Sequence, residues 1–235
     1  MKQCAPIIII PNFVVFEGGD GSGTSTQLAM IQHRFDTSAK TANAPLPVLY
    51  TTFEPTHGPV GHLLRSALRG DHPLGQDTLA LLFAADRNEH VYATGGILDR
   101  CGRGELVISD RYVLSSLVYQ GIACGGDLPE GLNAHFPAPE VLFFFDIDPE
   151  IARKRMETRQ VKEIYEYLDF QIKVREAYKA LLPRYGDQGV RVEIIDASQP
   201  PEAVAETVWR GLEKMPIMAV GGTDGSRDAA GRSEV

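Results

Sequence analysis

The sequence predicts an α/β protein built on a five-stranded parallel sheet that helices cover on both faces. Five short apolar runs indicate this fold, and they lie at residues 13–17, 47–53, 105–109, 140–147 and 190–195. Val, Ile, Phe and Leu fill these runs without alternating with polar residues, which is typical of parallel strands buried on both sides. Longer helical stretches separate the runs, so strand and helix alternate as in the βαβ units of one doubly wound sheet.

The segments between the strands carry helical signals. Apolar side chains recur near helical spacing between residues 78 and 92. Helices are also predicted over 150–159 and 201–214, because a capping residue followed by proline precedes each of them. Residues 1–215 are therefore expected to form a single domain. The Gly-, Ser- and Asp-rich residues 216–235 are predicted to be a disordered tail.

Charge and composition argue against several classes of protein. The net charge of −8 disfavours general binding to nucleic acid, which prefers a basic face. The chain has no apolar run near the roughly 20 residues of a membrane span, and Ile7 to Ile10, ended by Pro11, is too short for a signal sequence. Its three cysteines show no paired spacing, as expected in a reduced compartment. We expect a cytoplasmic protein that binds neither nucleic acid nor membrane.

A glycine-rich segment follows the first apolar run. Residues 18–25 match the phosphate-loop pattern G-x-x-x-x-G-K-[ST], except that Thr24 stands at the lysine position. Backbone N–H groups of such a loop, with the positive end of the next helix, attract phosphate. Nucleotide phosphates are expected at Gly18, Gly21, Ser22, Gly23, Thr24, Ser25 and Thr26. Ser25 is also expected to hold Mg²⁺. The alternative is a glycine-rich turn that binds nothing.

Four further motifs follow the loop in order. They are Leu81-Leu82-Phe83-Ala84-Ala85-Asp86-Arg87, Ser109-Asp110-Arg111-Tyr112, Asp146-Ile147-Asp148-Pro149-Glu150 and Asp196-Ala197-Ser198-Gln199. Together with the loop, this series resembles the thymidylate kinase family, P-loop enzymes that phosphorylate dTMP with ATP. The resemblance extends from about residue 14 to residue 212. It implies a P-loop three-layer sandwich with a five-stranded parallel sheet covered by helices on both faces, and a homodimer.

The resemblance also implies a role for individual residues. Asp20 would accept a hydrogen bond from the 3′-hydroxyl of dTMP, Phe83 would stack on thymine, and Arg87 would donate to an exocyclic oxygen of the base. Arg111 would contact phosphate where the two substrates meet, and Asp110 would approach Mg²⁺ with Ser25. The resemblance adds Ser115, Tyr119 and Gln120 on the dTMP side, Ala197 near adenine, and a mobile lid over about residues 153–163.

Several of these residues also have a purely structural explanation. A phenylalanine on an apolar helix face, such as Phe83, usually belongs to the core. Asp110 and Arg111 could form a surface ion pair, although their place at the end of a strand favours a binding role. The basic run that begins at Arg153 could be a solvated helix face. Asp20 is the least ambiguous, because a carboxylate inside an anion-binding loop is electrostatically costly.

The chain departs from the family pattern at two positions where positive charge is expected. Thr24 replaces the loop lysine, and Phe53 stands where many relatives have the arginine of Arg-Glu-Pro. Members of the family without a basic residue beside Asp20, here Gly21, supply a catalytic arginine from the lid. We therefore hypothesise that Arg155 or Arg159 supplies the transition-state charge while Arg111 holds the acceptor phosphate, and that Arg65 or Arg69 assists.

The sequence thus predicts a Mg²⁺-dependent kinase that converts dTMP and ATP to dTDP for dTTP synthesis. A first alternative is a related nucleotide or nucleoside kinase with altered acceptor specificity, since Phe53 changes the acceptor-phosphate side. A second alternative is a catalytically silent nucleotide-binding protein, which Thr24 alone supports.

Overall fold

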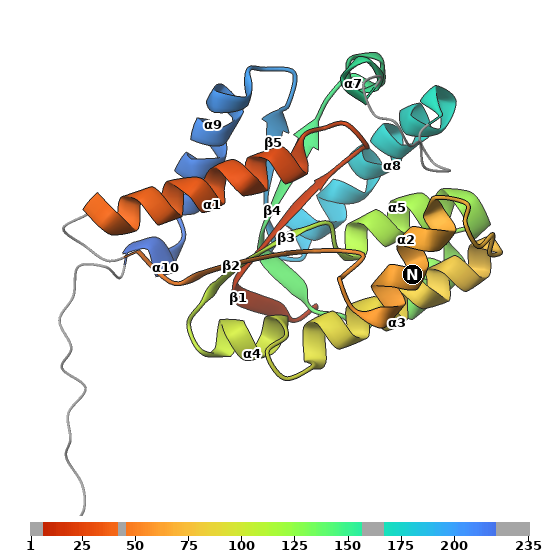
Figure 1. Ribbon diagram of the computed structural model, residues 1–235, viewed down its shortest axis with the longest axis horizontal. Helices are drawn as coiled ribbons and strands as arrows, with labels where there is room; N and C mark the ends of the chain where they lie inside the picture. The colour runs from red at the N-terminus through yellow and green to blue at the C-terminus, as the bar shows by residue number, and fades with distance from the viewer. Residues whose placement is uncertain (1–6, 42–45, 157–166, 220–235) are drawn as a thin grey trace, which may run out of the picture.

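One parallel sheet organises the computed structural model, which describes residues 7–41, 46–156 and 167–219 (Figure 1). Its strand order is β2-β3-β1-β4-β5, and every neighbouring pair is parallel. The strands are β1 Ile9–Gly18, β2 Leu49–Phe53, β3 Leu106–Asp110, β4 Ala138–Asp146 and β5 Arg191–Asp196. The predicted fold class, a five-stranded parallel sheet between helices, is confirmed.

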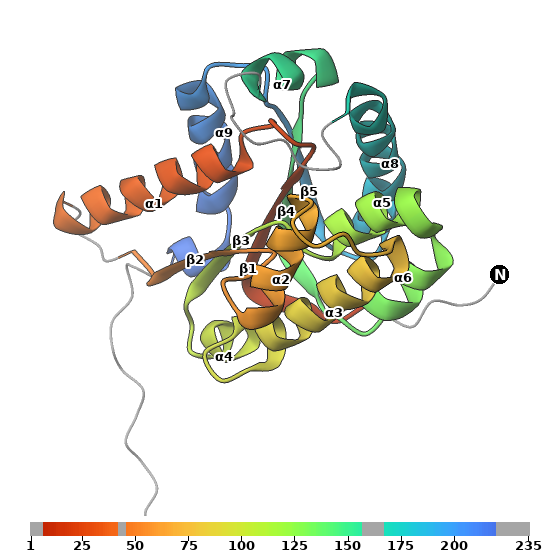
Figure 2. The same cartoon turned by 45° about the vertical axis from the view of Figure 1, so that its right-hand side comes forward.

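Helices form the two outer layers. They are α1 Thr24–Thr41, α2 Pro59–Leu68, α3 Gln76–Tyr92, α4 Ile97–Gly102, α5 Val113–Cys124, α6 Asp127–Asn133, α7 Pro149–Met156, α8 Leu168–Asp187, α9 Pro201–Glu213 and α10 Pro216–Ala219. Figure 2 shows α1 and α9 on one side of the sheet and α3, α5 and α8 on the other. Among the described residues, no helix is long and apolar enough to cross a membrane.

Successive side chains of an apolar run point alternately into the two helical layers, as the geometry of a strand requires. Val14 and Phe16 pack in the cluster beneath α1 and α9, whereas Phe13 and Val15 pack beneath α3, α4 and α5. All four side chains are buried. Because both faces of β1 are covered, its sequence shows a continuous apolar run and no polar alternation.

Most predicted boundaries move by one or two residues, and the two largest differences lie near the ends of the domain. β1 begins at Ile9 rather than at residue 13, with an irregular register between Ile10 and Val14 where Asn12 has a φ of +64°. Pro11 and Asn12 interrupt the apolar run, which hides this extension in the sequence. At the other end, residues 216–219 form helix α10 and do not belong to a disordered tail, because Ile217 and Met218 pack against the core. Residues 220–235 lie outside the described residues.

Candidate active site

The carboxyl ends of the strands bring the predicted site together at one edge of the sheet. β1 ends at Gly18, and the glycine-rich loop leads from there into α1. Gly21 and Gly23 have φ values of +81° and +92°, in the left-handed region that favours glycine. A Cβ on Gly18 would lie 2.5 Å from Oγ of Ser22 and 3.1 Å from the carbonyl oxygen of Phe145, so a side chain there would require its neighbours to shift. The loop therefore uses glycine where its backbone demands it.

Ser25 and Asp110 meet at the start of α1. Ser25 Oγ donates to Oδ2 of Asp110 over 2.5 Å. The other carboxylate oxygen, Oδ1, is buried and has no hydrogen-bond partner among the described residues. A hydroxyl beside a carboxylate with a free buried oxygen is an oxygen-donor set of the kind that Mg²⁺ prefers. These two residues therefore fit the metal site that the sequence predicts.

Asp20 is held by residues from two distant parts of the chain. Nη2 of Arg111 donates to Asp20 Oδ1 over 2.7 Å, and Nε2 of Gln171 donates to Oδ2 over 2.7 Å. The backbone N–H of Asp20 donates in return to Oε1 of Gln171 over 3.0 Å. The carboxylate inside the anion-binding loop is thus balanced by a guanidinium and oriented by an amide, which offsets its electrostatic cost.

A cavity of about 290 Å³ opens beside this loop. All seven residues predicted to bind dTMP line it, and they are Asp20, Phe83, Arg87, Arg111, Ser115, Tyr119 and Gln120. They come from the phosphate loop, α3, the end of β3 and α5. Sequence-distant side chains therefore converge on one space whose walls carry an aromatic ring, hydroxyls and guanidinium groups.

A second cavity, of about 320 Å³, lies on the other side of the same loop. Gly21, Gly23 and Thr26 line both cavities, whereas Ser22 and Ala197 line only the second. Thr24 and Ser25 line only the first. The loop is thus a wall shared by two spaces, an arrangement that suits two substrates meeting at their phosphates.

Helix α7, in which the predicted lid begins, packs directly against this wall. A Cβ on Gly21 would lie 2.7 Å from the carbonyl oxygen of Ala152. Arg155 lines the second cavity and not the first, and its Nη1 donates to the carbonyl oxygen of Ala197 over 2.8 Å. Arg155 thus lies beside the phosphate loop, and its catalytic role stays a prediction. Arg159, like most of the predicted lid, lies outside the described residues.

Arg87 is buried in a polar network beneath the first cavity. Its Nη2 donates to Oε2 of Glu54 over 2.6 Å and to the carbonyl oxygen of Tyr112 over 3.1 Å, and its Nη1 donates to Oδ1 of Asn133. Burial alone would raise the pKa of Glu54, but Arg87 and His90 hold that pKa below its usual value. Arg87 therefore serves first as the counter-ion of Glu54, which sequence analysis did not foresee.

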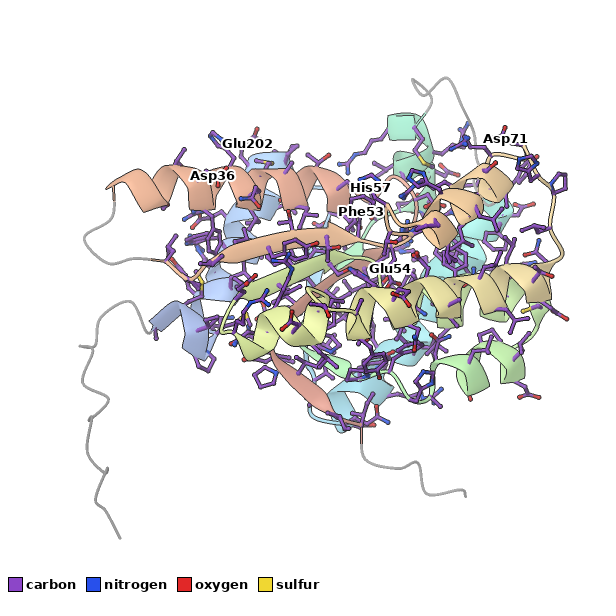
Figure 3. The ribbon with its side chains drawn as sticks, turned by 60° about the horizontal axis from the view of Figure 1, so that its bottom comes forward. Asp36, Phe53, Glu54, His57, Asp71 and Glu202 are labelled. Atoms are coloured by element: carbon purple, nitrogen blue, oxygen red, sulfur yellow. The ribbon has the colours of Figure 1, made fainter. Side chains whose placement is uncertain are left out.

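Phe53 does not line the first cavity, but Arg65 does. The Phe53 ring packs edge-on against the His57 ring, with 4.7 Å between the ring centroids. Figure 3 shows that the neighbouring Glu54 extends towards α3. The Arg65 guanidinium lies 5.4 Å over the Phe53 ring and donates to the carbonyl oxygens of Pro55 and Thr56. Arg69, in contrast, pairs with exposed Asp71. The structure thus separates the two arginines that the sequence left equivalent.

Among the described arginines that line the first cavity, Arg65 differs from Arg87 and Arg111 in its partners. Arg111 pairs with Asp20 and Arg87 pairs with Glu54. Arg65 lines the cavity without a carboxylate partner among the described residues, since its hydrogen-bond partners there are two carbonyl oxygens and the His57 ring. It is therefore a positive charge available to an anion in the cavity.

Sequence reasoning also missed Glu17 and Gln171. Glu17 is a fully buried acid at the end of an apolar strand, which is a local anomaly that could have signalled it. Gln171 lies in the first turn of α8 and reaches a loop 151 residues earlier in the chain. No sequence spacing reports such a contact.

Comparison with known proteins gives the same family on two grounds. The family model described as thymidylate kinase matches residues 16–208. A putative thymidylate kinase of Treponema pallidum (strain Nichols) is 42% identical over 209 residues, which cover 88% of this chain and 97% of that protein. A probable thymidylate kinase of Pyrobaculum aerophilum is 41% identical, covering 86% and 97%. One of Methanococcus maripaludis (strain S2) is 38% identical, covering 87% and 96%. This chain therefore belongs to the thymidylate kinase family.

Proposed function

We propose that this chain phosphorylates dTMP to dTDP with positive charge supplied by arginines in place of a phosphate-loop lysine. The thymidylate kinase activity follows from the family, whose model matches most of the chain. The observation that carries the assignment to these residues is the pair of cavities that share the loop wall. dTMP binds in the first cavity, ATP binds in the second, and the γ-phosphoryl group passes between them along that wall.

The first cavity suits a thymine nucleotide. Phe83 offers an aromatic face to the base, and Gln120 offers an amide to its edge. Asp20, held by Arg111 and Gln171, accepts from the 3′-hydroxyl of the sugar. Ser115 and Tyr119 complete the wall beside Arg111. Arg87 is already paired with Glu54, so the contact of Arg87 with the base is secondary to this structural role in the proposal.

The acceptor phosphate lies between Arg65 and Arg111 in this proposal. Thr24 and Phe53 carry no charge, so the chain lacks a loop lysine and the arginine that many relatives have at position 53. Arg65 rises from α2 over the Phe53 ring and lines the cavity that Phe53 itself does not line. Of Arg155 and Arg159, Arg155 is engaged by the carbonyl oxygen of Ala197 in the second cavity. Arg159 therefore remains the proposed lid source of transition-state charge.

Ser25 and Asp110 would hold Mg²⁺, which when bound neutralises charge on the phosphates of ATP. The protein's own contribution is alignment. The glycine loop directs backbone N–H groups at the donor phosphates, and Arg111 orients the acceptor. α7, which packs on Gly21, restricts the access of water to the phosphates from the lid side.

We also propose a homodimer that works in the cytoplasm. Large apolar side chains are exposed on neighbouring helices, at Leu63 on α2 and at Leu81 and Tyr92 on α3. Burying such side chains against a second copy stabilises a dimer. Light scattering of the purified protein tests this proposal, and a monomer at micromolar concentration would contradict it.

A coupled ATP–dTMP assay with and without Mg²⁺ tests the function. We expect Mg²⁺-dependent turnover of dTMP in preference to dUMP, dCMP, dGMP and thymidine. Preference for another acceptor would favour the altered-specificity alternative that Phe53 suggests, and no turnover with any of them would favour a silent nucleotide-binding protein. Thr24→Lys, measured beside it, should give little gain or a loss if the charge has moved to the arginines.

A further inference from the structure

Glu17 is a buried acid that the phosphate-transfer mechanism does not use. It is fully buried at the end of β1, one residue before the phosphate loop. Its Oε1 accepts the backbone N–H groups of Tyr112 and Ser115, over 3.0 and 3.2 Å. Its Oε2 accepts the hydroxyls of Ser115 and Tyr178, over 2.6 and 2.9 Å. Four donors, from α8 and from the start of α5 with its N-cap residue Tyr112, therefore converge on one carboxylate.

These bonds fix the turn that carries Arg111. α5 has no side-chain cap of its own, and Glu17 caps it from a neighbouring strand. Arg111 has a φ of +73°, a strained conformation for a residue other than glycine. Its backbone N–H donates to the carbonyl oxygen of Phe16 over 2.8 Å, and the next N–H, of Tyr112, donates to Glu17. Two consecutive residues of β1 thus hold both sides of the strained turn.

We propose that Glu17 is a positioning residue whose ionised carboxylate holds the Arg111 turn in its phosphate-binding conformation. Arg111 Nη1 donates to Oγ of Ser115 over 3.3 Å, so one hydroxyl contacts both Glu17 and the guanidinium. A protonated Glu17 donates a hydrogen bond through one of its oxygens. One of the hydroxyls that donate to the ionised carboxylate therefore has to rotate and accept instead. The neutral acid therefore binds the start of α5 less strongly and orients the Arg111 side chain less tightly.

The surroundings of Glu17 place this change near neutral pH. Burial raises the pKa of Glu17 to about 7, against the opposing effects of the Ser115 hydrogen bond and of Arg111. From α8, Tyr178 and Tyr185 face it as neutral phenols, because burial raises the pKa of both. The charged group that faces Glu17 most directly is thus Arg111, the residue that it positions.

Glu17→Gln is the direct test, because an amide imitates the protonated acid. Its oxygen accepts the two backbone N–H groups, and its NH₂ donates to the two hydroxyls. We expect the wild-type dissociation constant for dTMP, measured by calorimetry, and the KM for dTMP to rise as the pH falls through about 7. In Glu17→Gln both should be high already at pH 8, by about tenfold, the effect of weakening one charge-assisted hydrogen bond. Neither should then change further near pH 7.

Tyr178→Phe and Tyr185→Phe separate this role from simple loss of core packing. Tyr178→Phe removes one donor to the ionised Glu17, which should raise the pKa of Glu17. The rise in the dissociation constant and KM for dTMP should then begin at a higher pH. Tyr185→Phe removes another buried hydroxyl of α8 that makes no hydrogen bond to Glu17, and should keep the wild-type profile. Equal profiles in all four proteins, with only the melting temperature changed, would overturn the inference.

The inference rests on the proposed function, and the experiment distinguishes the two. A wild-type protein that neither binds nor phosphorylates dTMP contradicts the function itself. A wild-type protein that does both, beside a Glu17→Gln variant with the same affinity and pH dependence, contradicts only the role of Glu17.

Discussion

Replacing Arg65 with methionine removes from the first cavity the guanidinium that has no carboxylate partner among the described residues. Methionine keeps an unbranched apolar stem against the Phe53 ring and removes the charge. The loop beneath stays anchored, because Asp86 accepts the backbone N–H of Thr56 over 2.7 Å. The variant should therefore fold, with a defect confined to the recognition of phosphate.

The expected size of the defect follows from the loss of hydrogen bonds to a charged group. Such bonds contribute about 1.5–3 kcal/mol, which corresponds to a fall of roughly 10- to 150-fold in kcat/KM for dTMP. The acceptor phosphate is bound in both the ground state and the transition state. The loss should therefore appear mainly as a higher KM, with kcat changed by less than about threefold.

The assay is steady-state kinetics with dTMP at saturating ATP, and three controls make it specific. Arg69→Met, on the next turn, removes an arginine paired with exposed Asp71 and should leave KM unchanged. Thymidine, which has no phosphate, should inhibit the wild type and Arg65→Met with the same inhibition constant. Phe53→Arg combined with Arg65→Met should recover part of the affinity. A KM for Arg65→Met within twofold of the wild type would refute the reasoning, and so would an equal loss in Arg69→Met.

Three further predictions concern the surrounding structure. Glu54→Gln leaves the Arg87 guanidinium buried without its counter-ion, at a cost of about 3–5 kcal/mol in the free energy of unfolding at pH 7. Because the pKa of Glu54 is lowered in the folded protein, its stabilisation is present above the usual 4.5 and is lost as the pH falls below that value, so denaturation curves of the wild type and Glu54→Gln should converge in acid. Gly21→Ala should raise the KM for ATP and destabilise the protein more than Gly70→Ala does, because both residues have positive φ but only Gly21 faces Ala152; equal effects would contradict the contact with α7. Ser25→Ala should raise the Mg²⁺ concentration needed for half-maximal rate, and an unchanged Mg²⁺ titration would exclude Ser25 as a ligand.

Some features of this protein could be predicted from its sequence because their signals are local. A parallel strand covered on both faces is a continuous apolar run, and a phosphate loop is a fixed spacing of glycines after such a run. The carboxyl ends of neighbouring parallel strands meet at one edge, so Ser25 and Asp110 could be expected together although 85 residues separate them. Asp20 and Arg111 reach the same cavity for that reason, whereas the other predicted dTMP residues are brought there by the packing of α3 and α5.

Other features were decided only by packing between distant elements. The sequence gives Arg65 and Arg69 the same standing, and only the position of α2 over Phe53 directs Arg65 into the cavity. The sequence leaves Arg155 and Arg159 as equal candidates for the lid charge, and only the approach of α7 to the β5–α9 loop shows that Arg155 lies beside Ala197. Glu17 looks like an interruption in an apolar strand until α5 and α8 bring four donors to it. The sequence by itself thus determined the fold, the phosphate loop and the family. The tertiary structure decided which charges face the substrates, because each charge depends on a partner that no sequence spacing specifies.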